Sequence, residues 1–237
     1  MITLYRFAPS FGLVNTSPFC VKLEAWLRLA GLPYRVEAIR DPSVGPKGRA
    51  PFIEDDDGRR VGDSSLVIEH LRKSRGVDPD DWLTPAQRGI GRAIGAMLEE
   101  RLYFALLYNR WIEPANWPTV RGHMLAGLPD EVADTIREYQ RARIVGHGIG
   151  AHSAEEIGAI AAGDVAAVSD ILGDQPFLFG DRPASADCTA FGFMHGLLCR
   201  AFDGAARREI EGRPNLLAYE RRMRERLFPE LLDSAAT

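Results

Sequence analysis

Hydrophobic and polar positions in the first part of the chain predict a strand, a helix and a second strand. Residues 2–7 form a mostly apolar stretch typical of a strand, and residues 34–38 alternate apolar and charged positions, as in a strand with one buried face. Between them, five apolar residues recur at helical spacing before Gly31 and Pro33, which favour a helix end. They are Phe19, Leu23, Trp26, Leu27 and Ala30. A crossover helix of this length implies that the two strands are parallel.

A hairpin and another helix complete this first unit. Residues 51–54 and 59–62 flank an Asp-Asp-Asp-Gly turn, whose Asp-Gly step supplies the positive φ angles that a tight hairpin needs. The apolar positions of residues 64–73 again have helical spacing. We therefore expect an α/β domain of order βαβ-ββα over residues 1–76, followed by a polar linker at residues 77–84.

From residue 85 to residue 237 the apolar spacing is helical throughout, which predicts an all-helical second domain. Three stripes carry this prediction: Ile90, Ile94, Met97, Leu98, Leu102 and Ala105; Val132, Ile136, Tyr139 and Arg143; and Ile157, Ile160, Val168 and Leu172. Residues 188–202 are apolar on nearly all sides, so we expect a central buried helix there.

Composition narrows the class of protein. Of the 237 residues, 46% are hydrophobic and 26% are charged, as in soluble globular chains, and the net charge of −4 argues against nucleic acid as a partner. The three cysteines are widely spaced and form no Cys-x-x-Cys pair, which suits a reducing compartment and predicts no metal site. Because we find neither a signal segment nor an apolar run of about 20 residues, we expect a cytoplasmic protein without a membrane span.

The stretch Ser17-Pro18-Phe19-Cys20 carries the main chemical signal. It places a hydroxyl where the first predicted helix begins, at its free backbone N–H groups and positive dipole end, and such a position stabilises an anion such as a thiolate. Serine followed by proline is also the ordinary start of a helix, and a lone cysteine is commonly a small buried hydrophobe. The motif alone therefore leaves both interpretations open.

Two further pairs have the same ambiguity when taken singly. Ala50-Pro51 opens the predicted third strand and is compatible with an ordinary edge strand, while Asp63-Ser64 precedes the next helix and is compatible with a helix cap. Together with Ser17-Pro18-Phe19-Cys20 and the following helical domain, however, the chain resembles the glutathione transferase superfamily. The stretches 148–157 and 178–187 are similar to the branch that contains metaxin and failed-axon-connections-like proteins.

The resemblance implies a thioredoxin-like N-terminal domain that binds glutathione, followed by the all-helical domain, in a homodimer. It puts Ser17 at the catalytic position of serine-type transferases. It assigns glutathione binding to Phe19, Arg49, Ala50, Pro51, Asp63 and Ser64. It places Tyr103, Tyr108 and Trp111 in the wall of a pocket for a small hydrophobic electrophile, although core packing would also explain these aromatic residues. No metal is implied.

Two departures from the family pattern affect this expectation. Ala184 stands where the central helix usually has a capping Ser or Thr, so the cap is expected to shift to Ser185 at a cost of about 1 kcal/mol. Arg6 lies near the position of the catalytic tyrosine in tyrosine-type enzymes, and Ser17 replaces the first cysteine of a dithiol site. The chain is therefore expected to be a serine-type enzyme if it is an enzyme.

We expect a transferase that conjugates glutathione to small electrophiles. Lowering a thiol pKa from about 8.5 to about 6.5 requires about 2.7 kcal/mol, which one hydrogen bond to the thiolate (about 1.5–3 kcal/mol) and a helix N-terminus (about 0.3–1 kcal/mol) supply. Two alternatives stay open: a non-catalytic adaptor of metaxin type, and glutathione-dependent peroxidase or lyase chemistry.

Overall fold

The computed structural model describes residues 1–233 and contains a four-stranded sheet in the order β2-β1-β3-β4. Strands β1 (Ile2–Arg6) and β2 (Tyr34–Ala38) are parallel, with Ile2 opposite Tyr34. Strands β3 (Phe52–Glu54) and β4 (Arg60–Gly62) form the hairpin, and β3 is antiparallel to β1. The predicted βαβ-ββα order is confirmed.

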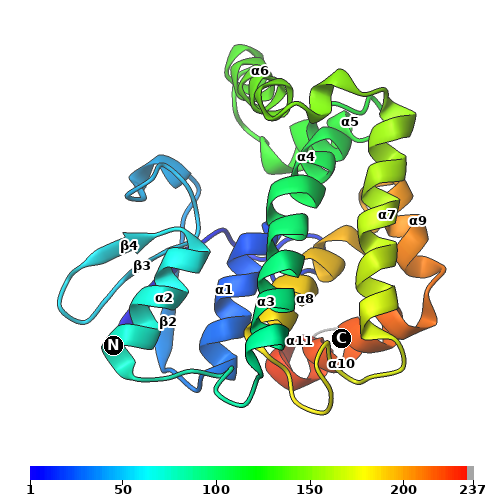
Figure 1. Ribbon diagram of the computed structural model, residues 1–237. Coiled ribbons are helices and arrows are strands. Elements are labelled where there is room, and N and C mark those ends of the chain that lie inside the picture. Colours follow the sequence, from blue (N-terminus) through cyan, green and yellow to red (C-terminus); the bar gives the residue numbers. More distant parts are fainter. Residues whose placement is uncertain (234–237) are drawn as a thin grey trace.

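Two helices cover the face of the sheet that carries Leu4 and Ile53 (Figure 1). They are α1 (Pro18–Leu29) and α2 (Ser64–Arg75). Because Leu4 and Ile53 are fully buried and belong to the same hydrophobic cluster as residues of both helices, this side of the sheet is the core of the first domain. The link from β2 to β3 contains only a 3₁₀ turn, Pro42–Val44.

The rest of the described chain is helical, as predicted. Helices α3 (Pro85–Ala96) and α4 (Tyr103–Trp111) are joined by a π-helical segment, Met97–Leu102, into one long rod (Figure 1). The other helices are α5 (Trp117–Thr119), α6 (Asp130–His147), α7 (Ala154–Leu172), α8 (Ser185–Leu197), α9 (Ala205–Glu211), α10 (Pro214–Leu227) and α11 (Glu230–Asp233). Across residues 1–233 we find no helix with the length and apolarity needed to cross a membrane.

The central helix α8 packs directly on α1 and so joins the two domains. It begins at Ser185 and ends at Leu197, so the predicted range of 188–202 was too late at both ends. The expected shift of its cap to Ser185 was also wrong. Ala184 remains the N-cap residue, and Asp187 Oδ2 accepts from its backbone N–H at 2.8 Å. The Ser185 hydroxyl instead accepts hydrogen bonds from Trp26 Nε1 and Arg72 Nη2 of the first domain.

Candidate active site

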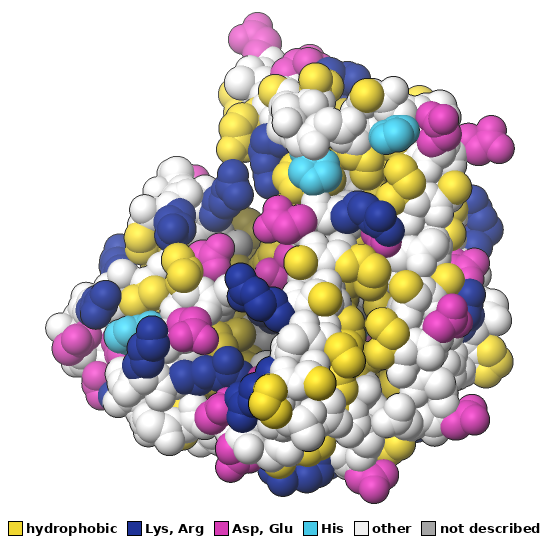
Figure 2. Space-filling model, viewed as in Figure 1, with side chains coloured by type: hydrophobic (Ala, Val, Ile, Leu, Met, Phe, Trp, Pro, Cys, Tyr) yellow, Lys and Arg dark blue, Asp and Glu magenta, His cyan; other side chains and the backbone are white. Residues whose placement is uncertain are grey.

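A cavity of about 670 Å³ lies between the two domains. Figure 2 shows a hollow between the two lobes, with acidic and basic side chains around it. The wall from the first domain includes all seven residues predicted for catalysis and glutathione binding: Ser17, Phe19, Arg49, Ala50, Pro51, Asp63 and Ser64. The opposite wall comes from the helical domain. It carries the aromatic residues Tyr103, Phe104, Trp111 and Tyr139, and also Leu107, Arg143, Glu99 and Glu100.

Ser17 is the N-cap residue of α1, with an extended backbone (φ −91°, ψ 118°) and Pro18 in the first turn. Its own N–H donates to Asn15 Oδ1 at 3.0 Å, and its carbonyl accepts from Cys20 N and Val21 N. Its hydroxyl makes no capping hydrogen bond to the helix backbone. The hydroxyl is therefore available at the half-buried floor of the cavity, beside the positive end of the α1 dipole.

Cys20 lies behind Ser17, fully buried. Burial raises the pKa of its thiol to about 11, although hydrogen bonds with the Ser17 side chain and the Phe7 backbone and the charge of Arg6 act in the opposite direction. At neutral pH Cys20 is a protonated thiol. The expectation that it is a small buried group is confirmed, and it cannot serve as a nucleophile in this state.

The two other motifs meet at the same cavity. The Ala50-Pro51 peptide is cis and leads into β3. Asp63 caps α2, because its Oδ1 accepts from Ser65 N at 2.9 Å and Leu66 N at 3.1 Å. The helix-cap interpretation is therefore confirmed, and the same residue also lines the cavity. Asp63 also has a φ of +82°, which costs an L-residue free energy and is typical of functional sites.

Phe19 and Arg49 also line this first wall. The Phe19 ring packs edge to face on Tyr103, with 4.8 Å between centroids, and so connects the two walls. Arg49 is exposed, and we find no hydrogen bond or ion pair for its side chain among the described residues. Its guanidinium is thus free to meet an anion at the mouth of the cavity.

The predicted electrophile wall needs one correction. Tyr103 and Trp111 line the cavity, but Tyr108 faces a second cavity on the other side of α4. The reason is helical geometry. Residues 103, 107 and 111 are four apart and share one face, whereas Tyr108 is five residues beyond Tyr103 and points away from it.

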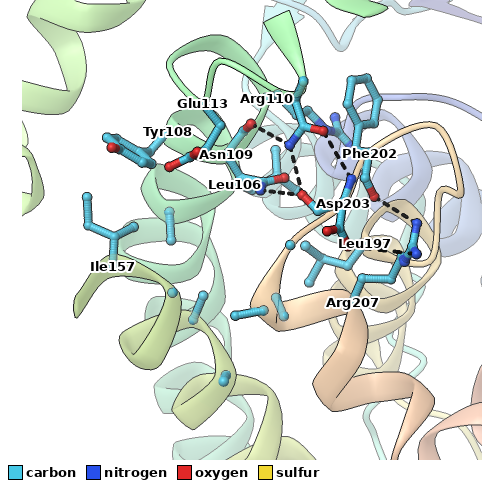
Figure 3. A pocket seen from close by; sticks show the side chains of 18 of the residues that line it. Leu106, Tyr108, Asn109, Arg110, Glu113, Ile157, Leu197, Phe202, Asp203 and Arg207 are labelled. Carbon is cyan, nitrogen blue, oxygen red and sulfur yellow. Dashed lines mark hydrogen bonds and ion pairs between the residues drawn. The ribbon is translucent and has the colours of Figure 1, made fainter. Parts of the chain in front are cut away.

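The second cavity, of about 440 Å³, lies between α4, α7 and the segment before α9 (Figure 3). Small residues of α7 and α9 line much of it. Its polar groups are bonded to one another: Asn116 Nδ2 donates to the carbonyls of Asn109 and Asp203, and Asp203 N donates to Asn116 Oδ1. These bonds connect α4 to the segment before α9 (Figure 3).

Sequence reasoning missed several charged groups at or beside the site, among them Glu99, which lines the cavity, and three basic residues. Lys22 is buried in α1, and its Nζ lies 2.5 Å from Glu99 Oε1 and 2.7 Å from Ser65 Oγ. Arg110 is buried between the two cavities, and Arg143 lies on the aromatic wall. Only Arg143 had a visible signal, because it continues an apolar helical stripe. The burial of Lys22 and Arg110 depends on tertiary packing and leaves no mark in the periodicity.

Comparison with known proteins agrees with this geometry. The glutathione S-transferase N-terminal domain family matches residues 18–116, and the glutathione S-transferase C-terminal domain family matches residues 161–223. The isoprene-epoxide–glutathione S-transferase of Rhodococcus sp. (strain AD45) is 30% identical over 95% of this chain and 98% of its own length. Failed axon connections of Drosophila melanogaster is 32% identical over 97% of this chain, which spans 59% of the fly protein.

Further similarities come from metaxin and from solved structures. Mouse metaxin-1 is 26% identical over 95% of this chain and 75% of its own length. The β-etherase LigF from Sphingobium sp. strain SYK-6 has the same fold, with a TM-score of 0.70, 20% identity and coverage of 98% of this chain and 99% of its own. A glutathione transferase homologue from Sulfitobacter with bound glutathione has a TM-score of 0.61, 17% identity and coverage of 100% and 99%. The chain therefore belongs to the glutathione S-transferase superfamily, with relatives in its metaxin and failed-axon-connections branch.

Proposed function

We propose that this protein binds reduced glutathione and conjugates it to small hydrophobic electrophiles, with Ser17 stabilising the glutathione thiolate. The observation that carries the proposal is the Ser17 hydroxyl. It caps no backbone N–H of its own helix, and it lines the cavity at the amino end of this 12-residue helix. The same cavity wall holds Pro51 and the Asp63-Ser64 pair.

The charges along this wall suit the tripeptide. The γ-glutamyl end, with its ammonium group, lies toward Asp63, Ser64 and the neighbouring Glu99, which all line the cavity. The cysteinyl part follows the Ala50-Pro51 backbone, and the glycine carboxylate lies toward Arg49. This orientation places the sulfur at Ser17, where its charge meets a hydroxyl donor and the helix dipole.

The reaction needs only groups that the chain and the tripeptide supply. The thiol proton leaves to solvent, and the Ser17 hydroxyl donates to the resulting thiolate. The sulfur then attacks the electrophilic carbon while that carbon's bond to the leaving group, or to an epoxide oxygen, breaks. The electron pair departs with the leaving group or stays on the epoxide oxygen, which takes a proton from water. The relative named for isoprene epoxide, which aligns over nearly its whole length, supports a conjugating activity for this chain.

A second candidate is a non-catalytic adaptor, which the metaxin-1 and failed-axon-connections relatives favour. A glutathione-dependent peroxidase or lyase is a third and would use the same thiolate with another acceptor. The proposal also includes a homodimer and a cytoplasmic location, as the sequence leads us to expect.

A thermal-shift titration with reduced glutathione separates enzyme from adaptor. If glutathione binds with a dissociation constant tenfold below the concentration used, the folded protein gains about 1.4 kcal/mol, and the melting temperature rises. No shift at millimolar glutathione would contradict the proposal and favour the adaptor. Given binding, conjugation of chlorodinitrobenzene by the wild type and by Ser17→Ala tests the role of the serine, since equal rates would remove Ser17 from catalysis.

A further inference from the structure

Arg143 is a cation on the helical wall of the cavity that has no anion beside it. It comes from α6 and is half-buried. Its Nη1 donates to Gln140 Oε1 at 2.7 Å and its Nη2 to the Tyr103 hydroxyl at 3.5 Å. No carboxylate of the described part of the chain lies within 4 Å of it. Because a guanidinium has five N–H donors, several of them are left for a ligand.

Other cations near this wall are already satisfied. Arg141 pairs with Glu138 at 3.1 Å, and Arg137 donates to the Trp111 carbonyl at 2.9 Å. The carboxylates that line the cavity are Asp63, Glu99 and Glu100, and of these Glu99 is paired with Lys22. Of the three arginines of α6, Arg143 is therefore the one that lines the cavity, and among the described residues it has no carboxylate partner there.

Aromatic rings surround the Arg143 guanidinium. Its central carbon lies 5.6 Å from the centroid of the Tyr103 ring, 5.8 Å from Phe104 and 5.9 Å from Tyr139. The His147 ring stacks on Phe104, with 3.9 Å between the two centroids and the rings nearly parallel. Rings at these distances attract a guanidinium and help to orient its plane, which prepares it to meet a planar anion.

The position of Arg143 separates it from the tripeptide site. Arg49 lies beside Ala50-Pro51 on the first-domain wall, where the proposed function puts the glycine carboxylate. Arg143 is on the other wall, with Tyr103, Phe104 and Trp111, where the electrophile belongs. A ring stacked against those side chains would direct a carboxylate substituent toward Arg143.

We infer that the electrophile is a small aromatic or conjugated compound that carries a carboxylate, and that Arg143 determines this specificity by holding the carboxylate. The inference rests on the proposed function and specifies its substrate class. Two parallel N–H···O bonds give an arginine and a carboxylate both strength and a fixed orientation. The apolar body of the substrate then lies against the aromatic wall, with its reactive carbon toward the sulfur above Ser17.

A matched pair of substrates tests the inference: 4-(chloromethyl)benzoate and its methyl ester, each normalised to its uncatalysed reaction with glutathione. In both, a sulfur–carbon bond forms at the benzylic carbon, the carbon–chlorine bond breaks, and chloride leaves with the electron pair. The wild type should prefer the acid in kcat/KM by about 10- to 100-fold. Arg143→Leu should lose the preference by reacting more slowly with the acid alone, and Arg143→Lys should retain part of it.

Arg141→Leu is the matched control, because Arg141 lies on the same helix, pairs with Glu138 and does not line the cavity. It should behave as wild type. Equal use of acid and ester by the wild type would overturn the inference while leaving the proposed function intact. So would an Arg143→Leu variant that slows both substrates equally and weakens glutathione binding, since Arg143 would then hold the tripeptide. If chlorodinitrobenzene is conjugated but neither of these substrates turns over, the inference fails and the proposed function stands. If glutathione binds and none of the three compounds is conjugated, the proposed function fails and the inference fails with it.

Discussion

The Ser17 hydroxyl forms a hydrogen bond with the buried Cys20 thiol and also lines the cavity. The bond to Ser17 lowers the pKa of Cys20, but burial has the larger effect and raises it to about 11, so Cys20 stays protonated at neutral pH. A protonated Cys20 does not require the single hydroxyl proton of Ser17, which is therefore available for a thiolate in the cavity.

Arg110 places a positive charge beside Thr16, the residue before Ser17. Its side chain is buried, donates to the Thr16 carbonyl at 2.6 Å and the Gly196 carbonyl at 3.0 Å, and has no carboxylate partner among residues 1–231. Burial lowers the pKa of its guanidinium to about 10, so it is still charged at neutral pH. Because Thr16 directly precedes Ser17, the thiolate that we propose at Ser17 would form near this positive charge.

Replacing Arg110 should change both stability and ionisation. Arg110→Met leaves two buried carbonyls unsatisfied and should lower the free energy of unfolding by about 2–4 kcal/mol. It should also raise the pH midpoint of kcat/KM for the electrophile at saturating glutathione, because the bound thiolate loses a nearby cation. Denaturant unfolding and a pH-rate profile measure the two effects.

Arg110→Lys separates these effects. It keeps the charge but not the fork geometry, so it should keep the pH midpoint near that of the wild type while still losing stability. An unchanged midpoint in Arg110→Met would show that Arg110 only supports the loop.

At the residue scale, the sequence could predict the motif residues but not the cavity's charges. Ser17, Pro51 and Asp63 follow recognisable element boundaries, and all three line the cavity. Tyr108 was misplaced because an aromatic cluster near the end of a helix does not say which side chain shares a face with the site. Arg110 and Lys22 could not be predicted, since their burial is decided by segments far away in the chain.

At the scale of elements, the β3-β4 hairpin is tied to α2 through one carboxylate. Asp55 Oδ2 lies 2.7 Å from His70 Nε2, and Asp55 is also an ion-pair partner of Arg75. Burial raises the pKa of Asp55, but the hydrogen bonds from His70 and the Asp56 backbone and the charge of Arg75 outweigh it, so the pKa is lowered overall. One carboxylate oxygen from each of residues 55–57 lies within 4.8 Å of the others. The hydrogen bond with His70 and the charge of Arg75 keep Asp55 ionised beside its two acidic neighbours.

This arrangement predicts a pH-dependent role for Asp55. A lowered folded-state pKa contributes stability above the unfolded-state value of about 3.9, and the contribution is lost as the pH falls through the folded-state pKa. Asp55→Asn should therefore be less stable than the wild type by about 1–2 kcal/mol at pH 7. The difference should vanish once the pH falls below the folded-state pKa of Asp55. Urea unfolding at several pH values measures it, and a difference that persists unchanged at low pH would contradict the assignment.

The elements themselves were largely predictable because period-2 and helical spacings differ so clearly. Strands β3 and β4 each begin one residue later than expected, and the helical stripes correspond to α3, α4, α6 and α7. The ends of α8 were not predictable from the sequence. Its apolar run continues through a turn after Leu197, and Ser185 serves the contact with Trp26 instead of the cap.

At the scale of the whole molecule, the two domains meet where α8 crosses α1, and a glycine allows the close approach. A Cβ atom on Gly192 would lie 2.6 Å from the Pro18 carbonyl oxygen and 3.2 Å from Lys22 N. Both contacts are with the backbone of the first two turns of α1, and Pro18 directly follows Ser17. The position of the serine thus depends on the packing of the second domain.

Gly192→Ala should push the start of α1 away from α8. We expect the free energy of unfolding to fall by about 1–3 kcal/mol and glutathione affinity to fall with it, as chemical denaturation and calorimetric titration would show. The control is Gly163→Ala on α7, where an added Cβ meets nothing within 4 Å. This variant should be neutral, or more stable by up to about 1 kcal/mol, with unchanged glutathione binding. Equal behaviour of the two variants would contradict the proposed coupling of domain packing to the site.

The ionisation of bound glutathione tests the central claim most directly. The thiolate absorbs in the ultraviolet, so a pH titration of the complex gives the thiol pKa in the wild type and in Ser17→Ala. We predict a midpoint near 6.5 in the wild type, about two pKa units below the free thiol, and a rise of about one to two units in Ser17→Ala. A bound thiol that titrates near 8.5 in the wild type, or at the same pH in both proteins, would contradict the account.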